Sequence, residues 1–447
     1  MGITMKFYNR ESELNILNKI YEQCEKSYGK ITVLTGRRRI GKTLLAKKYA
    51  EDKESLYLFT SKKTEKLICE EFLQLYEEFS GTKFIGRIDY FSQIFELLLK
   101  LGTEKRFVLI IDEFQEFGNI NKSTFSEIQK LWDQYKFETH IHIIFIGSIY
   151  SMMKKIFQDE KEALYGRADR ILYIKPFNPT IIQEILKDNN SYNDENLFYN
   201  YLITGGVPRY QEILVENNIF TKDDIIDFIL QKDSFFIEEG KTLLIQEFGK
   251  EYGVYFSILE LIACGRTSRS ELESIFEKSI GGFLDRLENE YDVITKVKPI
   301  GAKKDSRNQK YAIKDNFLKF WFRFIYKYMS VIEIDRFNYV KDLIERDLNT
   351  FAGPILEKLF IDIMYCSDEY GLIGNYWEKK NQNEIDIVGI NEITKKIYFS
   401  EVKLNKNKVK MNILEEKSQN LLKYYNDYEV KYEGLSIEDI SEKIRTI

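Results

Sequence analysis

Cysteine, proline and histidine are scarce in this chain, which has 447 residues with 4 Cys, 5 Pro and 2 His. The cysteines lie far apart and form no CxxC pair, which argues against both a disulfide framework and a zinc ribbon. Reduced cysteines fit a cytoplasmic protein. His140 and His142 lie in or beside one apolar segment without a cysteine or a third histidine nearby, which favours a structural role over metal binding.

Long apolar runs and an excess of one charge are missing as well. No segment approaches roughly 18 consecutive apolar residues, and residues 1–10 lack the pattern of a secretory signal. The 66 Lys and Arg against 71 Asp and Glu give a net charge of -5, so DNA contact would need a local basic patch. With 44% hydrophobic residues the chain is not globally disordered. We expect a soluble, cytoplasmic protein of roughly three domains that does not associate with a membrane.

The first third of the chain alternates short apolar runs with helical segments. Residues 29–35 form a β-rich run, and a loop at residues 36–43 separates it from the helix-forming residues 44–50. Two β-branched runs follow at residues 107–111 and 141–146, with a helical stretch between them at residues 125–135. This pattern predicts an α/β fold with a buried parallel sheet.

Residues 36–43 match G-x-x-x-x-G-K-[ST] between a predicted strand and a predicted helix, the context that a P-loop requires. A chance match in a basic turn is the alternative. Backbone N–H groups and the helix N-terminus would hold phosphate oxygens, Lys42 would reach the β and γ phosphates, and Thr43 would bind Mg²⁺. The predicted nucleotide-binding residues here are Gly36, Arg37, Arg38, Arg39, Ile40, Gly41, Lys42, Thr43 and Leu44.

A second apolar strand ends in Asp112 and Glu113, about 70 residues after the P-loop. Asp112 would hold Mg²⁺ through water, and Glu113 would act as the general base for the attacking water. The next strand ends in Gly147 and Ser148. The Ser148 hydroxyl could contact the γ-phosphate or orient the water, although a simple turn explains these two residues nearly as well.

The order of these motifs resembles the archaeal-type ATPases, within the STAND and AAA-like P-loop NTPases. The resemblance implies that Arg10 lies near the adenine, that Arg167 is an arginine finger, and that Pro208 lies in a helical lid near the nucleotide. Arg170 is an equally reachable cation, and an ordinary surface arginine is the alternative. The matching segments are residues 7–14, 36–43, 111–113, 147–148, 164–167 and 205–208.

The domains expected after the ATPase core (residues 1–178) begin with a helical lid (179–250) and a winged helix-turn-helix (251–315). Ser268 and Glu271 have the capping-box spacing, and strands are predicted at residues 293–297 and 310–313. A helical connector (316–350) leads to a last α/β domain (351–447).

The resemblance also implies that this last domain has a PD-(D/E)xK nuclease-like fold. Asp386 is expected to end one short strand, and Glu401 and Lys403 lie on another, where residues i and i+2 share a face. The two carboxylates would bind Mg²⁺ while the lysine polarises a phosphate or a water, and Glu357 is the fourth acid implied by the resemblance. A solvated hairpin face, or a nuclease fold without activity, would explain the same residues.

Double-stranded DNA is one expected partner, held by lysines of the wing and of the last domain. The predicted recognition helix is too acidic for base reading, so backbone contact through the wing is more plausible. Docking of another protein is an equal alternative, and solvated lysines are the commoner meaning of such runs. The basic residues are Lys296, Lys298, Lys303, Lys304, Arg307 and Lys310 in the wing, and Lys395, Lys396, Lys403, Lys406, Lys408 and Lys410 in the last domain.

Taken together, the sequence predicts an ATPase that uses ATP and Mg²⁺ and whose nucleotide state controls a nuclease-like domain. An ATP-dependent DNA-binding switch without cleavage is the main alternative. A scaffold that binds protein, or that assembles with itself, is another.

Overall fold

The computed structural model describes residues 5–303, 306, 308–378 and 382–446. The chain forms two compact units: an N-terminal unit of residues 9–175, and a C-terminal unit of residues 176–447 together with the opening residues 1–8. Within the described ranges, no helix has the length and apolar character needed to cross a membrane.

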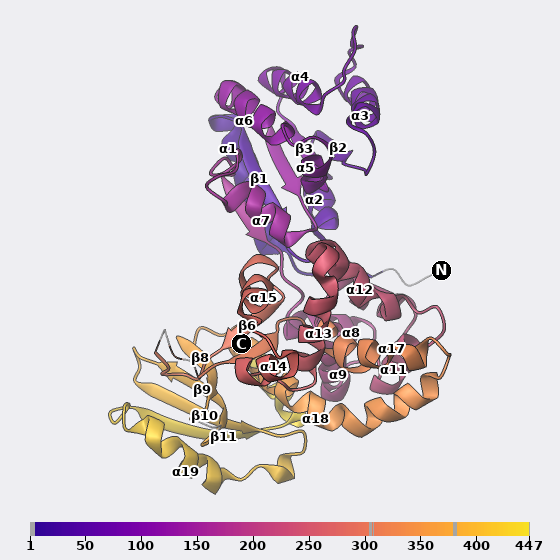
Figure 1. The fold of residues 1–447 in the computed structure, drawn as a ribbon. Coiled ribbons are helices and arrows are strands. Elements are labelled where there is room, and N and C mark those ends of the chain that lie inside the picture. Colours follow the sequence, from indigo (N-terminus) through magenta and orange to yellow (C-terminus); the bar gives the residue numbers. More distant parts are fainter. Residues whose placement is uncertain (1–4, 304–305, 307, 379–381, 447) are drawn as a thin grey trace. The chain divides into compact units, whose positions relative to one another are not determined.

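The N-terminal unit is a parallel sheet flanked by helices (Figure 1). Its strand order is β2-β3-β4-β1-β5, and every neighbouring pair is parallel. The elements are α1 (Glu11–Lys26), β1 (Lys30–Thr35), α2 (Lys42–Ala50), β2 (Ser55–Phe59), α3 (Glu65–Ser80), α4 (Phe91–Glu104), β3 (Val108–Asp112), α5 (Phe117–Ile120), α6 (Thr124–Tyr135), β4 (His142–Ile146), α7 (Tyr150–Gln158) and β5 (Arg170–Tyr173).

Strands β1, β3 and β4 are buried along their whole length, which explains why they are continuous apolar runs rather than alternating ones. The predicted α/β fold with a parallel P-loop sheet is therefore confirmed. Because all five strands are parallel, their carboxyl ends share one edge of the sheet, where ligands of open α/β sheets bind. The P-loop follows β1 at this edge, and Asp112 ends β3 there.

The C-terminal unit begins with helices and one short hairpin. Its first part contains α8 (Pro179–Asp188), α9 (Asp194–Thr204), α10 (Pro208–Glu216), α11 (Lys222–Ile229), α12 (Phe235–Phe248), α13 (Tyr252–Ala263), α14 (Arg269–Phe276), α15 (Gly281–Asp285), the antiparallel strands β6 (Ile294–Val297) and β7 (Lys310–Ile313), α16 (Asn316–Phe320), α17 (Met329–Ile332) and α18 (Phe337–Met364).

Helix α18 continues through Pro354, so the expected boundary between residues 350 and 351 falls inside a helix of 28 residues.

The last part of this unit is a separate mixed sheet of order β11-β10-β9-β8. Alternate residues of β9 and β10 face opposite sides: Ile387 and Tyr398 pack in the same cluster as Phe360 of α18, whereas Val388 and Phe399 pack with Leu414 of α19. The sheet thus lies between two helices. Its elements are β8 (Leu372–Tyr376), β9 (Ile385–Asn391), β10 (Lys396–Val402), α19 (Met411–Leu422), β11 (Glu429–Leu435) and, after the sheet, α20 (Ile440–Arg445).

Two expectations about this sheet are wrong. Asp386 does not end a strand: it is the second residue of β9. Lys403 does not lie on a strand: it directly follows Val402, the last residue of β10. Because β9 and β10 are antiparallel, with Ile387 opposite Ser400, the beginning of β9 lies beside the end of β10. Asp386 therefore still lies close to the segment that carries Glu401 and Lys403.

Candidate functional site

The P-loop connects the buried strand β1 to the first residue of α2, Lys42. Gly36 has a φ of 137°, and a Cβ atom there would lie 2.6 Å from the carbonyl oxygen of Ile174, so this close approach requires glycine. Gly41 precedes α2 with a φ of 86°. The Lys42 ammonium is buried and donates to the carbonyls of Gly36 (2.8 Å) and Arg37 (2.9 Å). Both carbonyls belong to the loop that would bind the phosphates.

The other loop residues differ in exposure. Ile40 is buried and contributes to the core, whereas Leu44 and Arg39 are exposed, and Arg37 and Arg38 are half-buried.

The Asp112 carboxylate joins the P-loop helix to two strands. Its Oδ2 accepts hydrogen bonds from the Thr43 hydroxyl at 2.6 Å and from the Tyr57 hydroxyl at 2.9 Å. Its Oδ1 accepts from the backbone N–H of Glu113 at 2.8 Å. Burial and the neighbouring Asp112 raise the pKa of Tyr57, which keeps this hydroxyl a donor. The two residues predicted to hold Mg²⁺, Thr43 and Asp112, are thus in direct contact.

Glu113 and Ser148 meet beside this pair. The Ser148 hydroxyl donates to Glu113 Oε2 at 2.7 Å, and the Gln115 amide nitrogen donates to the same oxygen. Glu113 itself has a φ of 52°, a left-handed conformation that turns the chain sharply at the end of β3. The sheet edge therefore brings together a carboxylate and a hydroxyl from two neighbouring strands.

Buried polar atoms without hydrogen-bond partners in the described structure collect in the same segments. They are Thr35 Oγ1 at the end of β1, Thr60 Oγ1 and Ser61 Oγ after β2, and Gln115 Oε1 after β3. Leaving such atoms unpaired costs roughly 1–3 kcal/mol each, so a polar ligand or water is the expected partner. This chemistry, together with the Thr43 hydroxyl and the Asp112 carboxylate, fits Mg²⁺ and a phosphate chain.

Arg10 and Arg167 occupy different surroundings. Arg10 is buried, and its guanidinium donates to the carbonyls of Lys175 (2.7 Å) and Ile40 (3.4 Å), so it ties the start of α1 to the P-loop. Arg167 pairs with Asp133 at 3.1 Å on the surface of the same unit. An arginine finger at Arg167 would first have to leave this ion pair, and both roles stay predictions.

A second polar cluster lies in the C-terminal sheet. The Lys403 ammonium is 3.1 Å from both Asp386 Oδ2 and Glu401 Oε1, so the structure brings these three predicted residues together. Asp386 Oδ2 also accepts from the backbone N–H of Val402 at 2.8 Å. Burial opposes the charge on Lys403, but the two carboxylates outweigh it and raise the pKa of Lys403.

Glu357 of α18 approaches the cluster through Asn375 of β8. The Asn375 side-chain amide donates to Glu357 Oε2 at 3.3 Å and to the backbone carbonyl of Asp386 at 2.7 Å. Burial, with Asp386 and Glu384 nearby, raises the pKa of Glu357.

The C-terminal cluster has only part of a metal-ligand set. Glu401 Oε2 is buried and accepts no hydrogen bond within the described part of the chain, and the Lys417 ammonium lies 3.9 Å from it. Among the residues that the structure describes, no group of three or more His, Cys, Asp or Glu gathers as metal ligands. Asp386 and Glu401 would offer Mg²⁺ two carboxylates, with the remaining positions left to water or a phosphate.

Comparison with known proteins gives matches along most of the chain. Residues 7–214 match a family described as an ATPase domain predominantly from Archaea, and residues 321–420 match a family of archaeal and bacterial proteins of unknown function. The uncharacterized protein MJECL04 of Methanocaldococcus jannaschii is 30% identical over 406 residues, which cover 89% of this chain and 87% of that protein. The chain belongs to the archaeal-type ATPase family.

Solved structures support the fold of this archaeal-type ATPase. The Walker-type ATPase paby2304 of Pyrococcus abyssi is similar with a TM-score of 0.53 and 17% identity, over 71% of this chain and 96% of that one. The ORC2 protein of Aeropyrum pernix, in its ADPNP-ADP complexes, has a TM-score of 0.50 and 13% identity, over 77% and 96% of the two chains. At these identities the likeness shows the fold alone.

Pro208 belongs to the C-terminal unit of the archaeal-type ATPase. It is the first residue of α10. Helix α9 ends at Thr204, and Gly205, Gly206 and Val207 separate the two helices. The second of them, Gly206, has a φ of 72°, and a Cβ atom there would lie 2.1 Å from the carbonyl oxygen of Phe177. The Gly-Gly-Val-Pro segment is thus a tightly packed break between two helices, and its expected place near the nucleotide stays a prediction.

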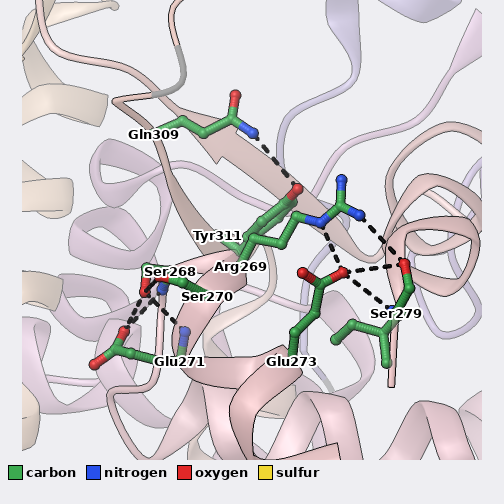
Figure 2. A network of polar contacts seen from close by, with 9 residues as sticks. Ser268, Arg269, Ser270, Glu271, Glu273, Ser279, Gln309 and Tyr311 are labelled. Atoms are coloured by element: carbon green, nitrogen blue, oxygen red, sulfur yellow. Dashed lines mark hydrogen bonds and ion pairs between the residues drawn. The ribbon is translucent and has the colours of Figure 1, made fainter. Parts of the chain in front are cut away.

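Residues 251–315, expected to be a winged helix-turn-helix, contain α13, α14, α15 and the β6–β7 hairpin. The predicted capping box is confirmed: Ser268 and Glu271 exchange hydrogen bonds at the start of α14 (Figure 2). In the same view Arg269 pairs with Glu273 at 2.9 Å and donates to Ser279. The arginine on this helix therefore already has partners within its own segment.

Many lysines expected to contact DNA are similarly paired with acids of the chain, which reduces the basic surface that they offer. Lys304 and Arg307 lie outside the described residues. The pairs are Lys296 with Glu288, Lys310 with Glu384, Lys395 with Asp427, Lys396 with Glu429, Lys403 with Asp386 and Glu401, and Lys406 with Asp439.

Three contributors to the two sites were missed by the sequence analysis. Gln115 follows Glu113 by two residues, so its proximity was a usable signal. Tyr57 could have been found by extending the strand search to the apolar residues 55–59. Asn375 carries no local signal, because its role depends on contacts with Glu357 and Asp386 from two other elements.

Proposed function

We propose that this P-loop ATPase hydrolyses Mg-ATP at the carboxyl edge of its parallel sheet and that its nucleotide state controls a phosphodiesterase-type site in the C-terminal sheet. The observation that carries the first half is the contact between Thr43 and Asp112 at 2.6 Å beside the Glu113–Ser148 pair. The second half is supported by the convergence of Lys403 on Asp386 and Glu401.

In the ATPase step, the N–H groups of the P-loop and the N-terminus of α2 bind the phosphates. Lys42 exchanges its carbonyl partners for phosphate oxygens, where its charge stabilises the transition state. Thr43 and Asp112 would hold Mg²⁺, which neutralises phosphate charge when bound. Ser148 orients a water, Glu113 takes its proton, and the water oxygen forms a bond to the γ-phosphorus while the bond to the ADP oxygen breaks.

In the C-terminal site, Lys403 holds and polarises a phosphodiester oxygen, and Asp386 and Glu401 would hold Mg²⁺, which supplies Lewis-acid activation of the phosphate when bound. To do this, Lys403 exchanges part of its contact with the two carboxylates for the phosphate. The substrate class that this chemistry suits is DNA, in line with the expectation from the sequence.

Two assays on the same preparations test both halves. ATP turnover is measured for the wild type, Lys42→Ala and Lys48→Ala, the last an exposed lysine of the same helix paired with Glu51. Turnover that is lost in Lys42→Ala and kept in Lys48→Ala supports the ATPase mechanism, whereas equal turnover in all three contradicts it. Cleavage of linear and supercoiled DNA with Mg²⁺ or Mn²⁺, with and without ATP, then tests the second half and its control by nucleotide.

One observation favours a second candidate, an ATP-dependent DNA-binding switch without cleavage. Lys403 pairs with both acids at 3.1 Å, an arrangement that a purely structural ion-pair cluster would also have. Salt-dependent DNA retention that responds to ATP, without cleavage under any metal condition, supports this candidate.

A further inference from the structure

The described residues between β6 and β7 include a segment that contacts the C-terminal sheet; together with Lys310, the first residue of β7, we call residues 298–303 and 308–310 the wing. The backbone N–H of Ile300 donates to the carbonyl of Asn375 at 2.9 Å, on the edge strand β8. The Ile300 side chain packs against the apolar cluster formed by the sheet and α19. The wing thus covers a sheet edge that would otherwise present unpaired backbone groups.

Further polar contacts join the wing to residues that follow Asn375 in the chain. The indole N–H of Trp377 donates to Asn308 Oδ1 at 2.9 Å, and Trp377 is only 3% exposed. The Lys310 ammonium is 2.8 Å from Glu384 Oε1 and 4.5 Å from the centre of the Trp377 ring. These contacts fall on Asn375, Trp377 and Glu384, all of which precede Asp386 in the chain.

Asn375 connects the wing to the acid cluster. Its backbone carbonyl accepts from the wing, while its side-chain amide donates to Glu357 Oε2 and to the carbonyl of Asp386. One residue therefore fixes the position of an acid on α18 and of the backbone that carries a second acid on β9. Partners of this kind, which orient metal ligands without touching the metal, commonly change metal affinity 10–100-fold when removed.

We propose that the wing is an intramolecular clamp on the C-terminal site, and that Asn375 is the positioning residue through which docking of the wing holds Glu357 and Asp386 in place. This inference rests on the proposed function of that site. It assigns the wing to the C-terminal sheet instead of to DNA, because Lys310 and Ile300 are engaged there.

Hydrogen exchange on the full-length protein, followed in peptides covering residues 298–303 and 372–377, tests docking of the wing. We expect slow exchange in the wild type, at least about tenfold faster exchange in Lys310→Ala combined with Asn308→Ala, and unchanged exchange in Lys314→Ala. Lys314 is the matched control, since it lies just after β7 and pairs with Asp292 within the hairpin segment. Fast exchange in the wild type, or equal acceleration in Lys314→Ala, overturns the clamp.

Calorimetric titration with Mn²⁺ tests the positioning role. The binding that Glu401→Ala removes defines the C-terminal site. We expect Asn375→Ala to weaken that binding at least about tenfold and Asn375→Gln, which keeps an amide donor, to recover part of it. A purely structural role for Asn375 would lower the unfolding temperature without changing the affinity of the folded protein, and this result overturns the positioning role.

The two experiments separate the clamp from the proposed function. If Glu401→Ala removes no Mn²⁺ binding, the metal-dependent function of the C-terminal site fails and the exchange rates alone decide the clamp. If Mn²⁺ binds in the wild type but Asn375→Ala binds it equally well, the clamp inference fails while the proposed function stands.

Discussion

The candidate sites of the two units are assembled in different ways. The phosphate site of the N-terminal unit takes most of its groups from one eight-residue loop and from residues that directly follow parallel strands, so the sheet topology alone brings them to one edge. The C-terminal cluster instead needs α18, β8, β9 and β10 to meet, and the hairpin segment to pack against β8.

The two sites also differ in the groups that surround their lysines. In the N-terminal unit the Lys42 ammonium donates to two neutral carbonyl oxygens, which phosphates can replace at low cost. In the C-terminal unit Lys403 is held by two carboxylates that would be left buried without their cation if it moved. The second site must therefore separate opposite charges to work, a cost that these two carbonyl contacts of Lys42 do not impose.

The largest effect is expected from Glu113→Gln, which keeps the shape of the side chain but removes the proton acceptor. We expect ATP turnover to fall about 10²–10⁴-fold, because general-base catalysis contributes about that much. The measurement is steady-state phosphate release, and nucleotide affinity should change little.

Glu104→Gln, an exposed carboxylate at the end of α4, is the control for Glu113→Gln. Equal ATP turnover in Glu113→Gln and Glu104→Gln would show that Glu113 is not the general base. The proposed chemistry of the N-terminal site would then be wrong.

The second largest effect is expected from Lys403→Ala in DNA cleavage. Removing the one cation that faces both acids takes away the group that would hold the phosphate, so we expect cleavage to fall about 10²-fold. Lys423→Ala, an exposed lysine that directly follows α19 and is not among the expected DNA contacts, should cleave as the wild type does. Cleavage that survives in Lys403→Ala would show that the ion pair is structural, and would sharpen the contrast between the two sites.

The sequence predicted much of the N-terminal unit and its candidate site because the relevant physics is local. A buried strand, a glycine-rich loop and a helix start are neighbours in the chain, so the P-loop and the parallel sheet followed from residues 29–50 and two later apolar runs. Asp386 was placed at the wrong end of its strand because periodicity locates a strand better than it fixes its ends.

The interactions that the sequence could not provide are those between distant segments. The pairing of Lys310 with Glu384, and of the Ile300 amide with Asn375, joins residues more than 70 positions apart. A lysine-rich wing suggested DNA contact because the charge of a side chain is visible in the sequence, whereas its partner is not. Only the packing of the hairpin segment on β8 shows that part of this charge is already neutralised.

A third, smaller effect distinguishes the units by their response to acid. Burial lowers the pKa of His142 from 6.5 to about 3, with its ring nitrogens hydrogen-bonded to Thr32 and Tyr49 at 2.8 Å. Below pH 6.5 the unfolded chain protonates His142, whereas the folded unit keeps this side chain neutral down to about pH 3. The contribution of His142 to stability is therefore complete above pH 6.5 and is lost as the pH falls toward 3. At pH 5 the loss is about 2 kcal/mol.

This loss should be confined to the N-terminal unit, because both histidines lie there. The measurement is denaturant unfolding of the wild type and His142→Gln between pH 7 and 5. We expect a smaller decrease in the free energy of unfolding in the variant, whose side chain does not titrate. An equal decrease in both proteins would mean that other groups cause the acid response.

The smallest effect concerns the first turn of α14 in the C-terminal unit. The Ser268 hydroxyl accepts from the N–H of Glu271 and donates to its carboxylate at 2.7 Å, so Ser268→Ala leaves a helix N–H without its cap. We expect the free energy of unfolding to fall by about 1 kcal/mol, measured by denaturant unfolding at pH 7. Ser270→Ala, two residues later in the same turn, should cost less because Ser270 is not the N-cap residue. Equal losses would mean that the cap contributes no more than an ordinary surface serine, and that the packing of residues 252–313 alone keeps α14 in place.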